Sequence, residues 1–464
     1  MEEQKKLRIA MVPWIGFGHM IPYLELAKCL AQLGHHVSFL APTRNIERLP
    51  SVPHDLRSQL NLVKLTPPHV EGLPEGAQST VDVPIDYLAQ LYEMLDGLED
   101  PVSEFLDANP STDWLIYDTF IWWAPRVAAK HGIPTVFFGP FSAMSLSIMG
   151  HPKVLMDPQP TTPEELTVPP PWVPFPTTVA FRYFEAVRIA RDRTRRATAS
   201  TEGAKNRIGV FEGTHVAIRS CREFEPEWIR LLGELYGKPV FPIGLLSPSV
   251  PKIDDKGNDT WVDQEWLDSQ KEGSTIYVAF GSEMRFSREQ AHELAIGLEL
   301  SELPFFWAYR GDPSLLPPGF EDRTKGRGIV RLGWAPQTRL LAHKSVGCFF
   351  THGGWGSSVE GLAFGKPFVL LPFQGDQGLN TCVMKERNVG VEVARNDRDG
   401  SFKREAIAES LKQVMGDDGE PIRSNAKELM KIFADKERHN EYIKDFADFL
   451  VENRRHDGVP APSA

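Results

Sequence analysis

The chain has 464 residues, 41% hydrophobic and 24% charged, which is the composition of a soluble globular protein too long for one hydrophobic core. Its net charge of −11 disfavours a nucleic-acid binder or a protein held electrostatically on anionic lipid, because both need a basic surface. Four cysteines without a CxxC pair predict reduced thiols. We see neither a secretory signal nor an apolar run of about 20 residues, so we expect a cytoplasmic protein without membrane insertion.

The first half of the chain alternates strand and helix signals. Arg8–Pro13 predicts a buried strand, a helix pattern runs from about Pro22 to Gly34, and Val37–Leu40 predicts a second strand. A strand, a helix and a strand in close succession predict parallel strands joined by a right-handed crossover. The pattern recurs in a strand at Trp114–Tyr117, a helix at Trp122–His131 and a strand at Thr135–Phe138.

The second half repeats this alternation after two proline-rich stretches. Residues 152–178 predict a long loop or lid, and Pro242–Asp259 has the composition of an interdomain linker. The expected strands then lie at Thr275–Phe280, Phe305–Tyr309, Gly328–Leu332, Gly347–Thr351 and Pro367–Pro372, with helices at Arg288–Glu299, Gln337–His343 and Ser358–Phe364. We therefore predict two α/β halves that bind ligands at the carboxyl ends of their strands.

These breaks predict four parts of the chain. The expected parts are an N-terminal domain at 1–241, a linker at 242–259, a C-terminal domain at 260–440, and a last helix with a tail at 441–464. Within the last part, Glu441–Asn453 carries its apolar residues on one face, as expected of a helix that packs back on the first domain. We expect the protein to be a monomer.

Polar and aromatic residues gather at three successive strand ends of the second half, in the sequences WAPQ, THGGWGSSVEG and PFQGDQG. The glycines of 353–356 followed by a helix suit a phosphate, because a helix N-terminus offers backbone N–H groups and a positive dipole end. His352 adds a donor, Trp334 offers a flat face to a base, and Glu360 offers a carboxylate to ribose hydroxyls. With Asp376–Gln377 as partners for sugar hydroxyls, the set favours a nucleotide-sugar site.

A dinucleotide cofactor is the obvious competitor, but its glycine pattern is incomplete. The third glycine of G-x-G-x-x-G is replaced by Ile21 after Gly16–Gly18 and by Val359 after Gly354–Gly356. The phosphate-binding loop G-x-x-x-x-G-K-[ST] is absent as well.

In length and register this region resembles the signature box of the plant secondary product glycosyltransferases of family 1. Trp334–Gln377 spans the 44 residues of that box, with W-x-x-Q, H-x-G-W-x-S-x-x-E and D-Q in register. The N-terminal FGH, the aspartate after WLIY, the FGS after TIYVA and the EGLPEGAQST loop extend the resemblance over nearly the whole chain. It implies a GT-B fold, in which two doubly wound Rossmann-like domains, N-terminal for the acceptor and C-terminal for the UDP-sugar, face each other across a cleft.

The resemblance also implies the residues of the donor site. They are Trp334, Ala335 and Gln337 at uracil, Ser282, His352 and Ser357 at phosphate, Glu360 at the ribose diol, and Trp355, Asp376 and Gln377 at the sugar. Two positions depart from the usual H-C-G-W-N-S. Gly353 replaces the cysteine, which we expect to be harmless, and Gly356 replaces the asparagine, which removes a side-chain contact to phosphate or sugar. We expect no cofactor besides the UDP-sugar substrate, and no metal ion.

The expected reacting groups lie in the first half, at the ends of two strands. His19 follows the first strand and Asp118 ends the strand WLIYD, so both can line one rim of a parallel sheet. A carboxylate bonded to one ring nitrogen fixes the tautomer of an imidazole and stabilises its protonated form. In the resembled family these positions are the base and its partner. The acceptor hydroxyl then gives its proton to His19 and attacks the anomeric carbon from the face opposite UDP, which inverts the configuration.

The resemblance also implies which donor sugar and which class of acceptor the enzyme uses. Gln377 is similar to the residue of glucose-using members, while UDP-rhamnose and UDP-xylose remain alternatives. The stretch Val70–Pro84 and the motif GSEM (281–284) resemble the branch that extends a sugar on a flavonoid, diterpenoid or triterpenoid glycoside, often by a 1,2-linkage; direct glucosylation of an aglycone is the alternative. The aromatic residues Phe17, Trp122, Trp123, Phe138 and Phe141 lie on expected acceptor-side turns or in an ordinary core. A nucleotide-sugar epimerase and an inactive UDP-sugar-binding scaffold are the competing functions.

Overall fold

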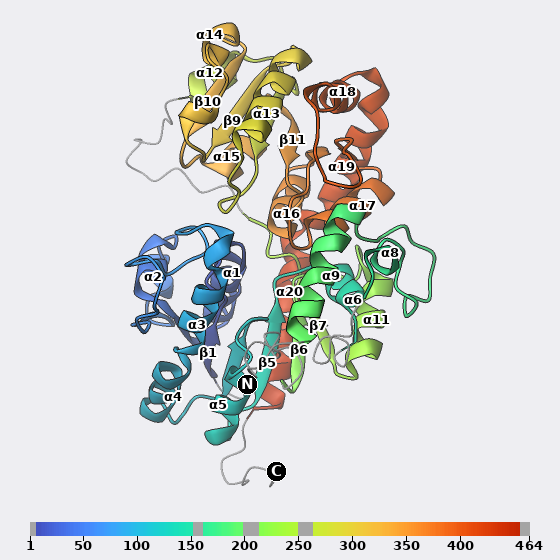
Figure 1. Cartoon of the computed structure of the whole chain (residues 1–464). Coiled ribbons are helices and arrows are strands. Elements are labelled where there is room, and N and C mark those ends of the chain that lie inside the picture. Colours follow the sequence, from blue (N-terminus) through green and yellow to red (C-terminus); the bar gives the residue numbers. More distant parts are fainter. Residues whose placement is uncertain (1–5, 152–160, 198–212, 249–262, 455–464) are drawn as a thin grey trace. The chain divides into compact units, whose positions relative to one another are not determined.

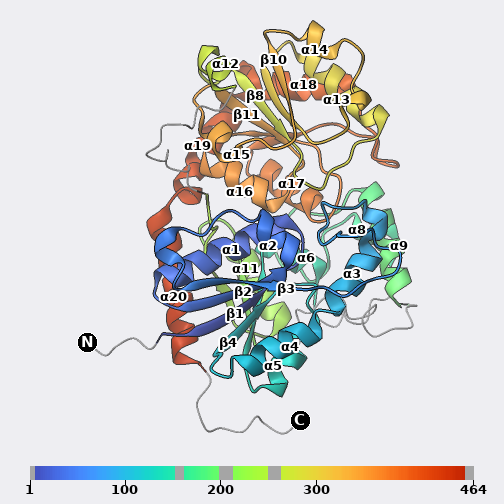
Figure 2. The ribbon, with the colours of Figure 1, turned by 90° about the vertical axis from the view of Figure 1, so that its left-hand side faces the viewer.

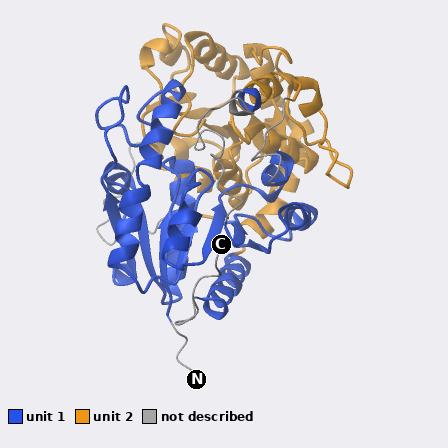
Figure 3. Ribbon diagram, turned by 60° about the horizontal axis from the view of Figure 1, so that its bottom comes forward, with its two compact units in different colours: residues 1–160, 192–246, 436–464 blue, residues 161–191, 247–435 orange. Residues whose placement is uncertain are grey.

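The computed structural model of the protein describes residues 6–151, 161–197, 213–248 and 263–454. The chain forms two compact units, coloured separately in Figure 3. The first unit consists of residues 1–160, 192–246 and 436–464, and the second of residues 161–191 and 247–435. Sequence reasoning had assigned 161–191 to the N-terminal domain, whereas the structure groups this segment with the second unit.

The first unit is built on a parallel sheet of seven strands in the order β3-β2-β1-β4-β5-β6-β7 (Figure 2). The order reverses between β1 and β4, which are neighbours with Val12 beside Tyr117. The strands are β1 (Arg8–Val12), β2 (His36–Pro42), β3 (Leu60–Leu65), β4 (Trp114–Tyr117), β5 (Thr135–Gly139), β6 (His215–Ile218) and β7 (Val240–Pro242).

Helices cover both faces of this sheet, with α1 on one face and α4 and α5 on the other (Figure 2). The right-handed crossover rule requires this, because the strands that follow β1 and β4 lie on opposite sides of the switch. The helices are α1 (Phe17–Gln32), α2 (Thr43–Arg48), α3 (Leu88–Asp96), α4 (Glu99–Ala108), α5 (Ala124–Lys130), α6 (Ala143–Met149), α11 (Pro226–Tyr236) and α20 (Lys436–Glu452), with 3-10 turns at His54–Leu56 and Ile85–Tyr87.

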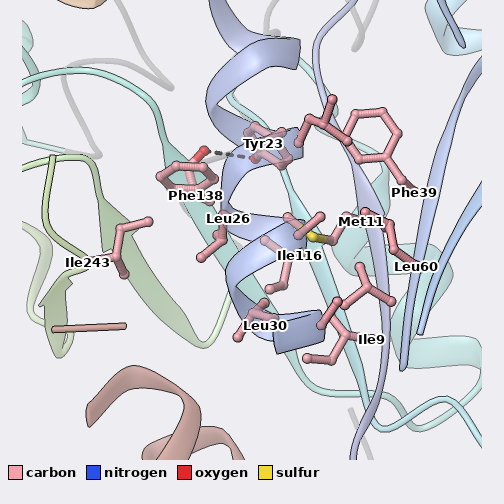
Figure 4. Packing of buried hydrophobic residues seen from close by; sticks show 14 of the residues in the cluster. Ile9, Met11, Tyr23, Leu26, Leu30, Phe39, Leu60, Ile116, Phe138 and Ile243 are labelled. Carbon is pink, nitrogen blue, oxygen red and sulfur yellow. Dashed lines mark hydrogen bonds between the residues drawn. The ribbon is translucent and has the colours of Figure 1, made fainter. Parts of the chain in front are cut away.

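The core of the first unit lies between the sheet and helices α1 and α20 (Figure 4). Alternate strand residues such as Ile9 and Met11 point toward α1, where Tyr23 donates a hydrogen bond to the carbonyl of Phe138 at 2.8 Å. On α20, Phe446 and Leu450 are buried in the same core, each contributing about 1.5–3 kcal/mol. The C-terminal helix is therefore an integral part of the first unit.

The second unit contains a parallel sheet of six strands in the order β10-β9-β8-β11-β12-β13. Its order reverses between β8 and β11, the same arrangement as in the first sheet. The strands are β8 (Thr275–Ala279), β9 (Phe305–Tyr309), β10 (Gly328–Leu332), β11 (Val346–Thr351), β12 (Phe368–Leu370) and β13 (Gly390–Glu392).

Helices α13 and α18 pack on the core face of the second sheet, where α13 contributes Leu294 and α18 contributes Leu411 (Figure 1). The helices of this unit are α8 (Pro163–Leu166), α12 (Gln264–Ser269), α13 (Arg288–Ser301), α14 (Phe320–Arg323), α15 (Gln337–Ala342), α16 (Trp355–Ala363), α17 (Gln377–Glu386), α18 (Arg404–Met415) and α19 (Glu420–Phe433), with α9 (Tyr183–Ala197) beginning here, and 3-10 turns at Pro313–Leu315 and Asp417–Gly419.

Several expected boundaries differ from the structure. Helix α1 begins at Phe17 rather than near Pro22, which lies inside the helix, so His19 belongs to the first helical turn. Helix α16 begins at Trp355 rather than at the Ser357–Ser358 step, because Gly354 takes the N-cap position. Strands β3, β6, β7 and β13 were not predicted, and neither were helices α2, α3, α4, α6, α8, α9, α11, α12, α14, α17, α18 and α19. Of the two proline-rich stretches, residues 152–160 of the first and 249–259 of the second lie outside the described residues.

Candidate active site

His19 and Asp118 meet at the switch point of the first sheet. His19 is on the first turn of α1, directly after β1, and Asp118 follows the last residue of β4. Since β1 and β4 are parallel neighbours, their carboxyl ends share one edge of the sheet. The Nδ1 atom of His19 lies 3.0 Å from both carboxylate oxygens of Asp118. The predicted pair is therefore assembled across 99 residues of sequence.

The carboxylate of Asp118 is completely buried, and both of its oxygens have hydrogen-bond partners. The backbone N–H of Trp14 donates to Oδ2 at 3.0 Å, and that of Thr119 donates to Oδ1 at 2.6 Å. With Nδ1 of the histidine, the buried carboxylate lies within hydrogen-bond distance of three nitrogen atoms. His19 itself is 16% exposed, so its ring can reach a ligand. Nδ1–H toward Asp118 leaves Nε2 as the basic nitrogen.

Aromatic rings surround this histidine. Phe141 packs edge-on to the His19 ring at 5.0 Å, and Phe120 lies 6.3 Å away on another side. Phe120 in turn contacts Trp14 and Tyr92, at ring distances of 4.7 and 5.5 Å. These rings, tilted relative to one another, form an apolar aromatic wall beside His19.

The aromatic residues chosen from the sequence fit this wall only in part. Phe141 belongs to it, but Trp123 and Phe138 are fully buried core residues, and Trp122 bonds Asp96 beneath the Arg126 guanidinium. Sequence reasoning missed Trp14 and Phe120, although both follow strand ends. It also missed Tyr92, which lies on helix α3, a helix that was not predicted from the sequence.

The predicted donor residues lie at the carboxyl edge of the second sheet. Ser282 follows β8, Trp334 and Ala335 follow β10, and Gln337 begins α15; His352 follows β11, Trp355, Gly356 and Ser357 form the first turn of α16, Glu360 lies one turn further, and Asp376 and Gln377 begin α17 after β12. Because these strands are parallel, their ends share one edge. All eleven candidates therefore lie at the carboxyl edge of the second sheet.

The glycines around His352 bring its ring into close contact with two backbones. A Cβ atom at Gly281 or at Gly354 would stand 2.9 Å from Nε2 of His352, so a side chain at either position would displace the ring or the backbone. Thr351 Oγ1 lies 3.1 Å from Nδ1, and burial lowers the pKa of His352 to about 4. The imidazole is neutral at physiological pH, and with Nδ1 accepting from Thr351 its Nε2–H can donate to an anion.

The first turn of α16 offers backbone donors. Gly354 is the N-cap without a side-chain cap, and the N–H of Ser358 donates to the Gly354 carbonyl at 2.9 Å. The N–H groups of the residues before Ser358 precede this first helical bond, as at any helix N-terminus. No acidic side chain lies in this turn to oppose an anion. Gly356 therefore contributes a backbone N–H where the usual asparagine would add an amide.

A hydrogen-bond chain holds the expected ribose and base residues. Tyr277 donates to Oε1 of Gln337 at 3.0 Å, and Nε2 of Gln337 donates to Glu360 at 2.6 Å. Burial and the Glu360 carboxylate raise the pKa of Tyr277, which keeps it a neutral donor. Trp334 is 73% exposed, as a stacking platform must be, while Ala335 is buried.

The two residues expected at the sugar, Asp376 and Gln377, are held by hydrogen bonds from their own loop and helix. The side-chain oxygen of Gln377 accepts the backbone N–H groups of Phe373 and Gln374 at 2.8 and 3.0 Å, so its NH₂ end is the part left for a ligand. Asn380 donates to Asp376 at 2.9 Å and to the Gly353 carbonyl at 3.1 Å, joining this loop to the phosphate turn. Sequence reasoning missed Asn380, although it lies one helical turn after Asp376.

Trp355 differs from expectation in its orientation. Its indole is only 3% exposed and packs edge-on against Phe433 of α19 at 6.4 Å. A contact to the sugar from this position would therefore come from the backbone rather than from the ring.

The described residues contain neither a metal-binding cluster nor a membrane-spanning helix. Among them, no three His, Cys, Asp or Glu side chains gather in a geometry that could hold a metal ion. No helix within the described ranges is both long and apolar enough to cross a membrane. All four cysteines are described and carry free thiols.

Comparisons with known proteins agree with the sequence motifs and the two sheets. Residues 252–461 match the family described as UDP-glucoronosyl and UDP-glucosyl transferase. The chain is 43% identical over 451 residues to UDP-glycosyltransferase 91C1 of Arabidopsis thaliana, covering 97% of each chain, and 40% identical over 469 residues to soyasaponin III rhamnosyltransferase of Glycine max, covering 97% and 96%. Its fold is similar to that of Arabidopsis thaliana UGT89C1 complexed with UDP-L-rhamnose, with a TM-score of 0.73 and 26% identity over 96% and 100% of the two chains. The protein therefore belongs to the plant family 1 UDP-glycosyltransferases, inverting and metal-independent enzymes of GT-B fold.

Proposed function

We propose that this enzyme moves glucose from UDP-glucose to a sugar hydroxyl of a plant natural-product glycoside, with a flavonoid, diterpenoid or triterpenoid core. The observation that carries the proposal is the pair of His19 and Asp118, whose ring nitrogen and carboxylate lie 3.0 Å apart at the sheet edge. A binding scaffold has no need of an oriented base, and an epimerase needs acid and base groups around the sugar itself.

In the proposed reaction, Nε2 of His19 takes the proton of the acceptor hydroxyl as that oxygen attacks the anomeric carbon. The imidazolium that forms is stabilised by the buried carboxylate of Asp118. The leaving diphosphate is stabilised by the N–H groups of α16, by His352 and by Ser282. One displacement breaks the bond to UDP and forms the new glycosidic bond, so an α-linked donor yields a β-glucoside.

The donor assignment rests on Gln377 and Asp376. The anchored amide of Gln377 presents two N–H donors and Asp376 presents a carboxylate, a combination suited to neighbouring sugar hydroxyls. UDP-rhamnose is the second candidate, favoured by the name of the soyasaponin III rhamnosyltransferase and by the UDP-L-rhamnose bound in UGT89C1. UDP-xylose is a further alternative from the family resemblance.

The acceptor assignment rests on the soyasaponin III rhamnosyltransferase of Glycine max, because the saponin in its name already bears sugar. The aromatic wall of Phe120 and Phe141 suits a flat or polycyclic core beside the reacting hydroxyl. Direct glucosylation of an aglycone hydroxyl is the alternative that this wall equally allows.

A donor-by-acceptor panel tests the proposal. We would incubate the protein with UDP-glucose, UDP-rhamnose or UDP-xylose and with matched glycosides and aglycones, and identify products by mass spectrometry. A hexose added to glycosides in preference to aglycones supports the proposal, and a deoxyhexose or pentose would move the donor to an alternative. Isomerised UDP-sugar without acceptor, or binding without turnover, would contradict it. As a matched test of the base, His19→Ala should abolish transfer while UDP still binds.

A further inference from the structure

One segment of the second unit lies along helix α17, the helix that begins with the sugar-site residue Gln377. This segment, Thr177–Arg188, includes the first turns of α9, and we call it the α17 brace. It contacts α17 and the preceding loop at four successive levels, from Glu386 near the C-terminal end of α17 to Phe373 before its N-terminal end. Figure 1 shows α9 and α17 as neighbours.

The brace is anchored firmly at the C-terminal half of α17. The backbone N–H and the hydroxyl of Thr178 donate to the Glu386 carboxylate at 2.6 and 2.7 Å. One turn earlier in α17, the thiol of Cys382 lies 3.6 Å from the Ala180 carbonyl. These contacts fix where the brace starts, and they lie far along the helix from the sugar-site residues.

A partly buried ion-pair cluster follows at the middle of the brace. Nε of Arg182 donates to Glu392 of β13 at 2.8 Å, and Nη2 lies 2.7 Å from the other oxygen. Burial pulls the pKa of Glu392 upward, but the hydrogen bond and charge of Arg182 and the charge of Lys385 on α17 outweigh it and leave the pKa lowered. Glu392 is therefore a shared anion that ties the brace to both β13 and α17.

The cluster contacts the first turn of α17 directly. Glu185, 3% exposed, receives the backbone N–H of Arg182 at 2.9 Å, and a Cβ atom on Gly378 would stand 2.3 Å from its carboxylate. Gly378 immediately follows Gln377, and the N-cap residue Asp376 makes no side-chain cap hydrogen bond to α17. The brace thus adds a second carboxylate, beside that of Asp376, near the positive end of the helix that begins with Gln377.

The end of the brace reaches the loop before α17. Nη1 of Arg188 donates to the carbonyl of Phe373 at 3.0 Å, while the N–H of Phe373 is held by the side chain of Gln377. Arg395 bonds the neighbouring Pro372 carbonyl, and its guanidinium stacks on the rings of Phe373 and, in the brace, Phe184, at 5.2 and 4.7 Å. Arg188 of the brace therefore holds the Phe373 end of the Phe373–Gln377 loop, together with Arg395. At the other end of the loop, Glu185 of the brace contacts Gly378.

We propose that Arg188 and Glu185 of the α17 brace are positioning residues for the donor sugar: by fixing the Phe373–Gln377 loop, they set how Asp376 and Gln377 meet the sugar without affecting the binding of UDP. The inference rests on the proposed sugar contacts of these two residues. It predicts an effect confined to the sugar, because the phosphate and base residues lie on α15, α16 and the ends of β8, β10 and β11. A segment that merely stabilised the unit would weaken UDP and UDP-glucose alike.

The test compares dissociation constants for UDP and UDP-glucose by calorimetry, with kcat and KM for transfer. Arg188 is exposed, so Arg188→Gln should fold normally. It should weaken UDP-glucose about threefold to tenfold, within the usual net contribution of one hydrogen bond, and leave UDP unchanged. Arg188→Lys should restore part of the loss. Arg191→Gln, an exposed arginine one turn further along α9, is the matched control and should change neither constant.

Glu185→Gln gives a second route to the same prediction, because it keeps the side-chain volume beside Gly378 and removes the charge. It should shift the ratio of the two constants in the same direction as Arg188→Gln. An unchanged ratio in both variants overturns the positioning role, as does an equal loss for UDP and UDP-glucose. Gln377→Ala separately tests the proposed sugar contact: if it leaves the ratio unchanged, that assignment fails, whatever the brace variants do.

Discussion

Asp118→Asn is the substitution that tests the reacting pair most directly. Asn has the shape of Asp but one acceptor oxygen instead of two. In the protein, one carboxylate oxygen accepts the Thr119 N–H at 2.6 Å and the other accepts the Trp14 N–H at 3.0 Å, while Nδ1 of His19 lies 3.0 Å from both. The amide NH₂ of Asn must therefore face a donor that the carboxylate had satisfied.

Two separate losses follow from this geometry. A buried N–H left without an acceptor costs about 1–3 kcal/mol of folding free energy. The loss of the charge that stabilises the imidazolium should lower kcat by about 10²–10⁴, the usual contribution of a positioned general base, which corresponds to about 3–5 kcal/mol of activation free energy. UDP affinity should not change, because the nucleotide residues belong to the other sheet.

The assay is transfer to a glycoside at saturating donor, with urea unfolding and UDP calorimetry alongside. Asp113→Asn is the matched control: Asp113 precedes the same strand, and its carboxylate likewise accepts a backbone N–H of the β1 segment, from Arg8 at 2.8 Å. It should keep full kcat. Because base and partner act as a unit, Asp118→Asn combined with His19→Ala should be no slower than the slower single variant. If the two losses multiplied, the side chains would act independently and the reasoning would be refuted.

The remaining predictions concern the second unit. Trp334→Ala should weaken UDP by about 1–3 kcal/mol with little change in stability, since the exposed ring contributes stacking rather than packing; calorimetry and melting curves measure both, and Trp334→Phe should recover part of the affinity. Gly356→Asn should strengthen donor binding or change donor preference in the panel, and if neither moves, Gly356 is not a specificity position. Gly353→Cys should cost about 1–2 kcal/mol in urea unfolding, because Gly353 has a φ of 78° and its Cβ would stand 2.7 Å from Thr381 Oγ1. Burial lowers the pKa of His352 from 6.5 to about 4, so between these pH values the unfolded chain binds a proton that the folded protein does not. The free energy of unfolding should therefore fall as the pH drops from 6.5 to 4, and it should fall less in His352→Gln. Identical pH profiles of unfolding for the two proteins would contradict this contribution of His352.

The clustering of most donor-site candidates could be predicted from sequence, because these residues follow strand ends in one continuous stretch. The signature from Trp334 to Gln377 needs only the rule that parallel strands end at one edge to bring its members together. Predicting the pair of His19 and Asp118 also required the resemblance to the family, because neither residue by itself indicates a catalytic role. The orientation of Trp355 could not be predicted, since it depends on Phe433 in a helix that lies outside the signature.

Other features depend on contacts that no local pattern encodes. The α17 brace bonds β13 across 210 residues of sequence, and a proline-rich approach to it predicts only a loop. The early start of α1 has a similar cause. The helix is stabilised by burial of Met20 and Tyr23 against the sheet, which overrides the usual preference of Pro22 for a first turn.

The two sheets suggest why chemistry gathers where it does in this fold. In each, the strand order reverses beside the first strand, between β1 and β4 and between β8 and β11. Right-handed crossovers then send the following helices to opposite faces, so the chain turns away on both sides and the strand ends stay uncovered. His19 and Asp118 follow one such strand pair, and Ser282 and His352 follow the other. The net charge of −11 should matter little to an anionic donor, because charges beyond about 8 Å are screened at physiological salt. The groups proposed for the diphosphate are backbone N–H donors and a neutral histidine.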